Sequence, residues 1–368
     1  MKVGIVTFHR AHNCGAALQC AALVEVIQRM KHDVWVIDNN TVGETHWPVF
    51  KGIKSLRSFA GWIVALIGSI GIAEIFYSRY KKFHSKLIPL LPHKSYYKDK
   101  ESFDIAMVGS DQVFNPSITG TQTGAFLLED IKYPIRKCCY ASSFGTSSLP
   151  ESWRARFSAA LSKFDYLTFR ESSADRIVHD ELKLNKKTKT VLDPTLLLCA
   201  DDYEKIEQPV NIKGQFVVVY CDSCCQNEAR YIAACIAKRL NIRYVYIDQY
   251  RRTRFKKAKD SLISVSPQEF VWLMRNAEYV VTTSFHGTVF SLINRKGFIV
   301  IRPRNNAMNE RTFNLLGQLE LMNQVVFDDS LPCVDSLKML EVDYNLIDQK
   351  LSALREESKM ALVEMLSH

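Results

Sequence analysis

Short runs of β-branched and aromatic residues alternate with longer amphipathic segments along this chain. In the first half, the pattern predicts strands at 2–8, 33–38, 103–108, 137–142 and 166–169, and helices at 16–30 and 153–163. The second half restarts it, with strands at 216–221, 243–247, 279–283 and 298–301 and helices at 227–240, 268–276, 288–294 and 342–366. Such alternation is typical of an α/β fold with parallel sheets.

A polar stretch with Pro209 and Gly214 separates the two halves. We therefore expect an N-terminal Rossmann-like domain at 1–198 that holds the acceptor, a linker at 199–214, a C-terminal Rossmann-like domain at 215–345 and a helix at 346–368 that can cross back to the first domain. Two such domains facing a cleft form the architecture called GT-B in glycosyltransferases. The fold alone does not name a reaction.

The formal net charge of +9 favours anionic partners such as phosphorylated small molecules, phospholipid surfaces or nucleic acid. Nucleic acid is not expected, because the sequence carries no aromatic RNP pattern and no paired zinc ligands. The N-terminal apolar run is too short for a signal peptide, which predicts a cytoplasmic protein with its ten cysteines as thiols.

The segment 51–86 leaves two interpretations open. Its centre, 58–73, is uncharged, and basic residues flank it on both sides. It is shorter than the roughly 20 residues of a membrane span, so it is either a helix that packs on the domain or one that lies on an anionic membrane surface.

A C-x-x-C-C pattern that suggests metal binding is formed by Cys221, Cys224 and Cys225. A structural zinc site requires four ligands, and no second cluster accompanies these three. We therefore expect small thiols at a strand end and no metal site.

Polar residues follow the predicted strand 279–283 at the point where a helix begins. Ser284, His286 and Gly287 lie at this junction, where open α/β sheets bind ligands and helix N–H groups favour an anion. His286 can act there as a proton donor, or it can be a structural histidine in a strand–helix turn.

Three other predicted strand ends carry polar groups. Asn13 and Gly15 follow the first strand, and Arg170 follows the strand at 166–169. Each of these groups has a structural alternative, because Asn and Gly build turns and Arg170 can pair with Glu171 or another carboxylate. The segment after the strand at 103–108 adds further candidates, for which turn capping is the alternative: Ser110, Asp111 and Gln112.

Taken together, these segments resemble the polysaccharide pyruvyl transferase family and follow one another in its order. The matching pieces are HNCGAALQCAAL (12–23), DIAMVGSDQVFN (104–115), YASSFG (140–145), FRESSA (169–174), VLDPTLLL (191–198), SPQEFVWLMRNAEYVVTTSFHGTVFS (266–291) and NERTFNLL (309–316). They span nearly the whole chain. Family members often carry Arg-Leu before the His-Gly pair, where this chain has Ser284 and Phe285.

The resemblance implies a GT-B-like fold and transfer of the enolpyruvyl carbons of phosphoenolpyruvate to a sugar of a surface polysaccharide or its lipid-linked precursor. The product would be a cyclic pyruvate ketal, and no metal or redox cofactor is needed. Basic groups must neutralise the carboxylate and phosphate of the donor, which points to Arg170 and Arg311. We expect His286 to act as general acid and Asp111 as base, and the substrate-binding set is completed by Ser284, Gly287, Asn13, Gly15, Ser110 and Gln112.

Two alternatives belong to other classes. A GT-B glycosyltransferase with a nucleotide sugar would use the same cleft and release a nucleotide diphosphate. A non-catalytic binding protein or a thiol or metal protein would use the cysteine cluster at 221–225.

Overall fold

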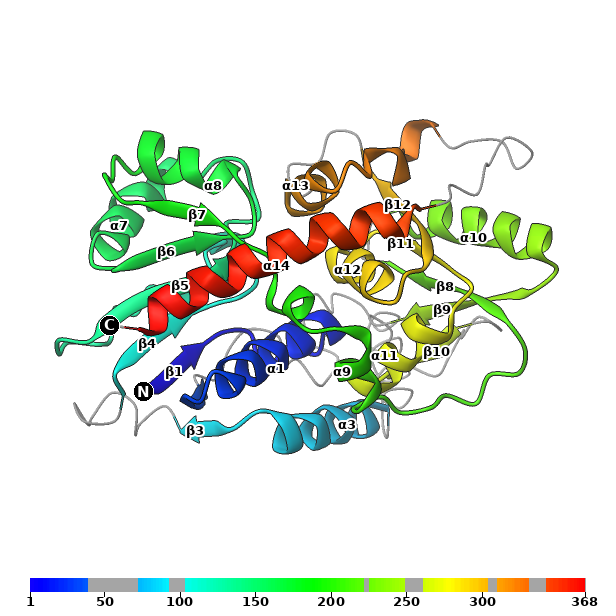
Figure 1. The fold of residues 1–368 in the computed structure, drawn as a ribbon, viewed down its shortest axis with the longest axis horizontal. Helices are drawn as coiled ribbons and strands as arrows, with labels where there is room; N and C mark the ends of the chain where they lie inside the picture. Colours follow the sequence, from blue (N-terminus) through cyan, green and yellow to red (C-terminus); the bar gives the residue numbers. More distant parts are fainter. Residues whose placement is uncertain are drawn as a thin grey trace, which may run out of the picture.

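The computed structural model describes residues 1–38, 72–92, 103–221, 225–248, 261–303, 310–330 and 342–367. Within these ranges the chain forms two separate sheets, and every strand pair in both sheets is parallel (Figure 1). The first sheet uses strands from residues 2–190 and the second uses strands from residues 216–327.

The first sheet has the order β3-β2-β1-β4-β5-β6-β7. Its strand order reverses between β1 and β4, which is the point where doubly wound sheets open a crevice at their carboxyl edge. The strands are β1 (Lys2–Val6), β2 (Asp33–Asp38), β3 (Leu90–Pro92), β4 (Ile105–Val108), β5 (Arg136–Ser142), β6 (Tyr166–Phe169) and β7 (Thr188–Thr190).

The second sheet repeats this topology with the order β10-β9-β8-β11-β12-β13. Its reversal lies between β8 and β11. The strands are β8 (Phe216–Tyr220), β9 (Arg243–Asp248), β10 (Ser261–Ile263), β11 (Tyr279–Thr282), β12 (Gly297–Arg302) and β13 (Val325–Phe327).

Helices cover both sheets, as continuous apolar strands require. Those of the first half are α1 (Cys14–Arg29), α3 (Ile72–Leu87), α5 (Pro116–Thr119), α6 (Thr123–Phe126), α7 (Glu151–Leu161), α8 (Ser173–Arg176) and α9 (Ala200–Glu204). Those of the second half are α10 (Gln226–Leu240), α11 (Pro267–Asn276), α12 (Phe285–Ile293), α13 (Glu310–Gln318) and α14 (Tyr344–Leu366). Two Rossmann-like domains of the predicted class are confirmed.

The last helix, α14, runs across both halves of the molecule (Figure 1). Near its start, Tyr344 Oη donates to the Lys296 carbonyl at 2.5 Å. Farther along, Ser358 Oγ accepts from the Leu192 N–H at 2.9 Å, and Arg136 donates to the Met365 carbonyl at 3.2 Å. The helix therefore ties the two sheets together. The predicted boundaries of the domains and linker stay a prediction.

The predicted strands all appear, shifted by at most two residues at their ends, but four strands were missed. β3, β7, β10 and β13 are three-residue strands at the sheet edges, too short to show a period. The helix predicted at 288–294 begins earlier, at Phe285, so His286 lies in its first turn. Residues 51–71 of the segment 51–86, and Cys224, lie outside the described residues. None of the described helices is long and apolar enough to cross a membrane.

The buried bond between Ser358 and Leu192 yields a stability prediction. Ser358→Ala leaves the Leu192 N–H without its acceptor, which should lower the free energy of unfolding by about 1–3 kcal/mol. Urea unfolding followed by circular dichroism measures the change. Ser162→Ala is the matched control because Ser162 is exposed, and an equal loss in both variants would contradict the role of α14.

Candidate active site

Polar side chains from both domains meet where the two strand orders reverse. Asn13 caps α1 after β1, and its Oδ1 accepts from the Ala16 N–H at 3.1 Å. Asp111 follows β4 in the left-handed backbone region, at a φ of 82°, which aspartate tolerates better than most residues. His286 lies in the first turn of α12, after β11. The strand ends selected from the sequence are thus brought to one place.

Gly15 of the first domain lies directly against the ring of His286 from the second domain. A Cβ on Gly15 would lie 2.1 Å from His286 Nδ1 and 2.3 Å from its Cγ, so only glycine leaves room for the ring. His286 itself is 5% exposed. The predicted role of Gly15 in presenting N–H groups is untested, but its lack of a side chain is required by this contact.

Arg170 lies buried between two carboxylates. Its Nε is 3.1 Å from Asp193 Oδ2, and its Nη2 is 3.4 Å from Asp111 Oδ1. Nε also donates to Ser110 Oγ at 3.0 Å. The structural alternative, an ion pair of Arg170 with Glu171 or another carboxylate, is therefore confirmed, with Asp111 and Asp193 as the partners.

Arg311 reaches the same carboxylate from α13. Its Nη1 lies 3.5 Å from Asp111 Oδ1. Arg170 and Arg311 both approach the ring of Phe285, with guanidinium carbons 5.2 and 5.4 Å from its centroid. Phe285 thus contributes a cation–π contact to two arginines that repel one another. Family members often carry leucine at the position of Phe285. In this chain the aromatic ring there contacts both arginines.

Asp193 is the site residue that the sequence analysis missed. Asp193 appears there only within the segment 191–198 and is given no role, yet its side chain is fully buried. Its Oδ2 accepts from Ser110 Oγ at 3.3 Å and lies 3.8 Å from His286 Nε2. The signal that could have found it is its place in the VLDPTLLL segment, directly after β7.

Burial sets the protonation of the histidine. Burial lowers the pKa of His286 to about 4, although Asp193 and Asp111 oppose this shift. Burial raises the pKa of Asp111, but the charges of Arg170, His286 and Arg311 outweigh it and leave the pKa of that carboxyl below its usual value. At neutral pH the protein without substrate therefore holds a neutral histidine beside an ionised Asp111.

Several buried polar atoms of this cluster make no hydrogen bond within the described part of the chain. They are Nη1 and Nη2 of Arg170, Nε of Arg311, Nε2 of His286 and Oε2 of Glu171. Buried donors without acceptors are costly, and an anion bound here would accept from the arginine nitrogens and from a protonated His286, whereas Glu171 Oε2 would need a donor. The cluster therefore has the chemistry of an anion site with a titratable nitrogen beside it.

The other candidates occupy supporting positions. Gln112 turns away and accepts from Asn115 Nδ2 at 3.0 Å. The Ser284 N–H donates to Thr282 Oγ1 at 3.0 Å, and a Cβ on Gly287 would lie 2.1 Å from that same Oγ1. Ser284 and Gly287 therefore shape the entry into α12, while their predicted contacts to substrate stay a prediction.

The described residues offer no support for the alternative function in which the cysteines at 221–225 form a thiol or metal site. Cys221 is buried and Cys225 is partly exposed, and neither is in a disulfide. Among the residues that the structure describes, no three His, Cys, Asp or Glu side chains are grouped to hold a metal ion.

The contact between Gly15 and His286 yields a double-mutant prediction. Gly15→Ala forces the ring to move and should cost roughly 1–3 kcal/mol of unfolding free energy through overpacking. In a His286→Ala background the same change should cost little, because the ring is gone. Chemical unfolding of the four proteins measures the coupling. Additive effects would contradict the contact.

Similar folds occur among known structures. The UDP-GlcNAc 2-epimerase of Methanocaldococcus jannaschii, in complex with UDP-GlcNAc and UDP, superposes with a TM-score of 0.50 at 11% identity, covering 100% of this chain and 99% of that one. The Neisseria meningitidis UDP-GlcNAc 2-epimerase bound to UDP-GlcNAc gives 0.46 at 12% identity, covering 100% and 99%. SsfS6, a Streptomyces glycosyltransferase, gives 0.41 at 12% identity, covering all of both chains. The likeness to the first of these supports the GT-B-like fold and nothing further.

Sequence comparison adds the family. No curated protein sequence matches the chain significantly. The family model described as polysaccharide pyruvyl transferase matches residues 13–305, which include the strand ends after β1, β4, β6 and β11 and the buried Asp193. The match extends over well more than half of the chain, and the chain therefore belongs to the polysaccharide pyruvyl transferase family.

Proposed function

We propose that the protein transfers the enolpyruvyl carbons of phosphoenolpyruvate to a sugar of a surface polysaccharide or its lipid-linked precursor. The product is a cyclic pyruvate ketal and the leaving group is phosphate. The observation that carries this proposal is the buried cluster of two guanidinium groups and a neutral histidine, each with an unused hydrogen-bonding nitrogen. Family membership supports the acceptor class and the transfer of pyruvyl carbons.

Phosphoenolpyruvate presents a carboxylate and a phosphate, and each needs charged donors. Nε of Arg311 and both Nη atoms of Arg170 can supply them without breaking a hydrogen bond, because these nitrogens make none among the described residues. The ion pairs that restrain both arginines on Asp111 are long, at 3.4 and 3.5 Å. A donor anion would therefore compete with Asp111 for the guanidinium groups at modest cost.

Binding of the donor would also charge the histidine. The pKa of His286 is lowered to about 4 by burial, so the side chain is neutral at pH 7 before the donor arrives. One negative charge about 4 Å away is worth roughly 4 kcal/mol at an effective dielectric constant of 20. That energy corresponds to about three pKa units. A single phosphate or carboxylate charge is therefore enough to bring His286 into the range of a general acid near neutral pH.

The reaction then proceeds by proton transfer to carbon. The proton on His286 Nε2 moves to the methylene carbon of phosphoenolpyruvate, and the electron pair of the double bond forms the new C–H bond. The carbon that bears phosphate becomes oxocarbenium-like, and a sugar hydroxyl adds to it as its proton leaves to a base. Phosphate then departs with the C–O electron pair, and a second hydroxyl closes the ketal and releases its proton.

Asp111 is the better placed of the two carboxylates to accept the hydroxyl proton. Its side chain is 13% exposed, whereas that of Asp193 is fully buried and occupied by Arg170, Ser110 and Thr195. Asp193 faces His286 Nε2 at 3.8 Å, which suits a positioning residue that stabilises the protonated ring. We therefore assign proton acceptance to Asp111 and orientation of the histidine to Asp193.

The acceptor would approach from the N-terminal domain, beside the loop between β1 and α1. A lipid-linked acceptor would place this face near the membrane, and peripheral contact through 51–86 stays a proposal, since 51–71 lie outside the described residues.

A nucleotide-sugar glycosyltransferase remains the competing function on this fold, and incubation with phosphoenolpyruvate and a panel of free and lipid-linked glycosides separates the two. Phosphate release with the mass of a pyruvate ketal supports our proposal.

Loss of one arginine should weaken donor binding. Arg311→Ala removes one charge-assisted contact, worth about 1.5–3 kcal/mol, so phosphoenolpyruvate affinity should fall about 10- to 150-fold. Calorimetry measures the affinity, and Arg295→Ala is the matched control because Arg295 is exposed and pairs with Asp348. Arg170→Ala should weaken binding as well. This change also removes an ion-pair partner of Asp111 and Asp193, so it should lower the stability of the fold. Unchanged affinity in Arg311→Ala would remove this residue from the donor site.

Loss of the general acid should remove turnover more than binding. His286→Ala should reduce kcat by about 10²–10⁴-fold with a much smaller loss of donor affinity. His286→Gln should not restore the rate, because an amide cannot donate a proton to carbon. The control is His179→Ala, since His179 is a partly exposed histidine in the π-helical turn Ile177–Glu181 after α8. A folded His286→Ala protein with a near-wild-type rate would refute the mechanism.

A further inference from the structure

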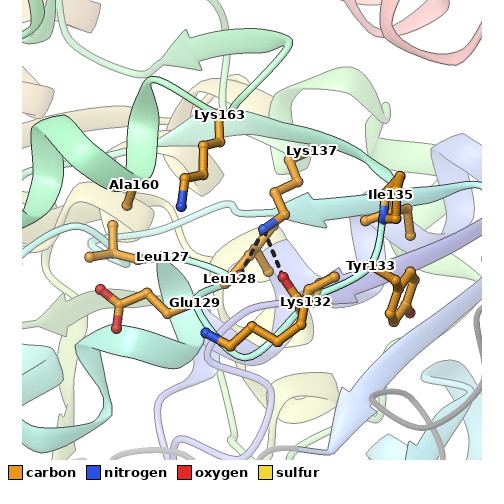
Figure 2. A pocket seen from close by; sticks show the side chains of 11 residues that line it. Leu127, Leu128, Glu129, Lys132, Tyr133, Ile135, Lys137, Ala160 and Lys163 are labelled. Atoms are coloured by element: carbon orange, nitrogen blue, oxygen red, sulfur yellow. Dashed lines mark hydrogen bonds between the residues drawn. The ribbon is translucent and has the colours of Figure 1, made fainter.

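A basic cavity lies near the amino-terminal end of β5, and Figure 2 shows the side chains that line it. It has a volume of about 380 Å³ and opens to solvent. Lys137 lines it from the start of β5, whereas the candidate active site lies at the carboxyl ends of the parallel strands. The cavity is therefore separate from the arginines and His286.

Three lysines line this cavity: Lys132, Lys137 and Lys163. Lys137 is 9% exposed, and its Nζ donates to the carbonyls of Leu128 at 2.9 Å and Ile131 at 3.3 Å, as the dashed lines in Figure 2 mark. An ammonium group has three donors, so one remains beyond these two bonds. Lys132 and Lys163 are exposed at the rim.

The cavity holds more positive than negative charge. Glu129 is its one acidic lining residue, and Arg156 binds that carboxylate through Nε at 2.7 Å and Nη2 at 2.5 Å. Within the described part of the chain, no carboxylate lies within ion-pair distance of any of the three lysines. Burial, and then the charges of Lys163 and Lys132, lower the pKa of Lys137. A bound anion would relieve this repulsion.

The remaining walls are largely apolar, formed by the side chains of Leu127, Leu128, Ile131, Tyr133, Pro134, Ile135 and Ala160. A free inorganic anion would not bury the apolar side chains of these walls. An anion with an organic part would bury it, and each buried CH₂ is worth about 0.8 kcal/mol. Pockets for small organic ligands combine apolar walls with a few polar or charged groups, and here the charged groups are ammonium groups that suit a phosphate.

We propose that this cavity binds a phosphate ester, with the phosphate held by Lys132, Lys137 and Lys163 and the organic group against the apolar wall. The source is either a soluble phosphorylated molecule or the head group of a phosphorylated lipid, since both present the same chemistry. The site does not depend on the proposed reaction. A purely structural role for Lys137, as a tie for the loop at 128–131, accounts for its two hydrogen bonds but leaves the two rim lysines without a function.

Calorimetry with phenyl phosphate and inorganic phosphate tests the site on the full chain. Phenyl phosphate should bind more tightly, and the double variant Lys132→Gln/Lys163→Gln should weaken its binding about tenfold or more. The matched control is Lys213→Gln/Lys238→Gln, which removes the same charge from exposed positions in the linker and in α10. Lys137 is left intact because it also holds the loop. Equal affinity in the two double variants would overturn the proposal.

The active site also attracts phosphate, so the two sites must be told apart. The Lys132→Gln/Lys163→Gln variant should keep wild-type affinity for phosphoenolpyruvate, whereas Arg311→Ala should keep the phenyl phosphate site. A loss of phenyl phosphate binding in Arg311→Ala alone would assign that binding to the active site and overturn the second site. Failure of ketal formation with intact binding of phenyl phosphate would count against the proposed function only.

Vesicle flotation identifies the source of the phosphate. Phosphatidylcholine vesicles with and without phosphatidic acid are compared for the wild type and both double variants. Binding to phosphatidic acid that Lys132→Gln/Lys163→Gln reduces would indicate a lipid-borne phosphate, and binding of phenyl phosphate alone would indicate a soluble one. Binding of neither probe would refute the site.

Discussion

The candidate site depends on one buried charge arrangement, the Arg170 guanidinium between Asp111 and Asp193. The three groups come from the ends of β6, β4 and β7, and their side chains are almost removed from water. Such an arrangement is stable only if its geometry compensates for lost hydration. The Ser110 hydroxyl lies within hydrogen-bond distance of both the Ala141 carbonyl, at 2.9 Å, and Asp193 Oδ2, at 3.3 Å, and so helps to hold this carboxylate. The first domain thus presents a rigid polar surface to the second.

The second domain completes that surface with groups that the first lacks. His286 packs on Gly15 and faces Asp193, and Asn314 donates to the Arg170 carbonyl at 3.0 Å. The α3–α11 contact, in which Arg79 binds Glu269 at 2.7 Å, holds the domains together farther out. A histidine kept neutral by burial, beside arginines with spare donors, can be charged by an incoming anion. The acid would thus become active only when the donor is bound.

Much of this arrangement could be predicted from the sequence because parallel sheets place strand ends at one edge. His286, Asp111 and Arg170 follow strongly apolar strands, and the structure brings all three together. Asp193 was missed because β7 is a short edge strand without periodicity, and its carboxylate gains meaning only through contacts distant in sequence. The lysine cavity was not predicted because its lining residues are spread over 127–163, in β5, α7 and the loops beside them. The sequence also did not indicate that the His286 ring, from the other domain, occupies the space beside Gly15 where a side chain would lie.

The central claim is that donor binding protonates a buried, neutral His286. Calorimetry of phosphoenolpyruvate binding near pH 6.5, in buffers of different ionisation enthalpy, counts the protons taken up. His286→Gln is measured in parallel, which cancels protons exchanged by the donor itself. The account predicts that the wild type takes up close to one proton more than His286→Gln on binding. Equal uptake by the two proteins, with both still binding the donor, would contradict it.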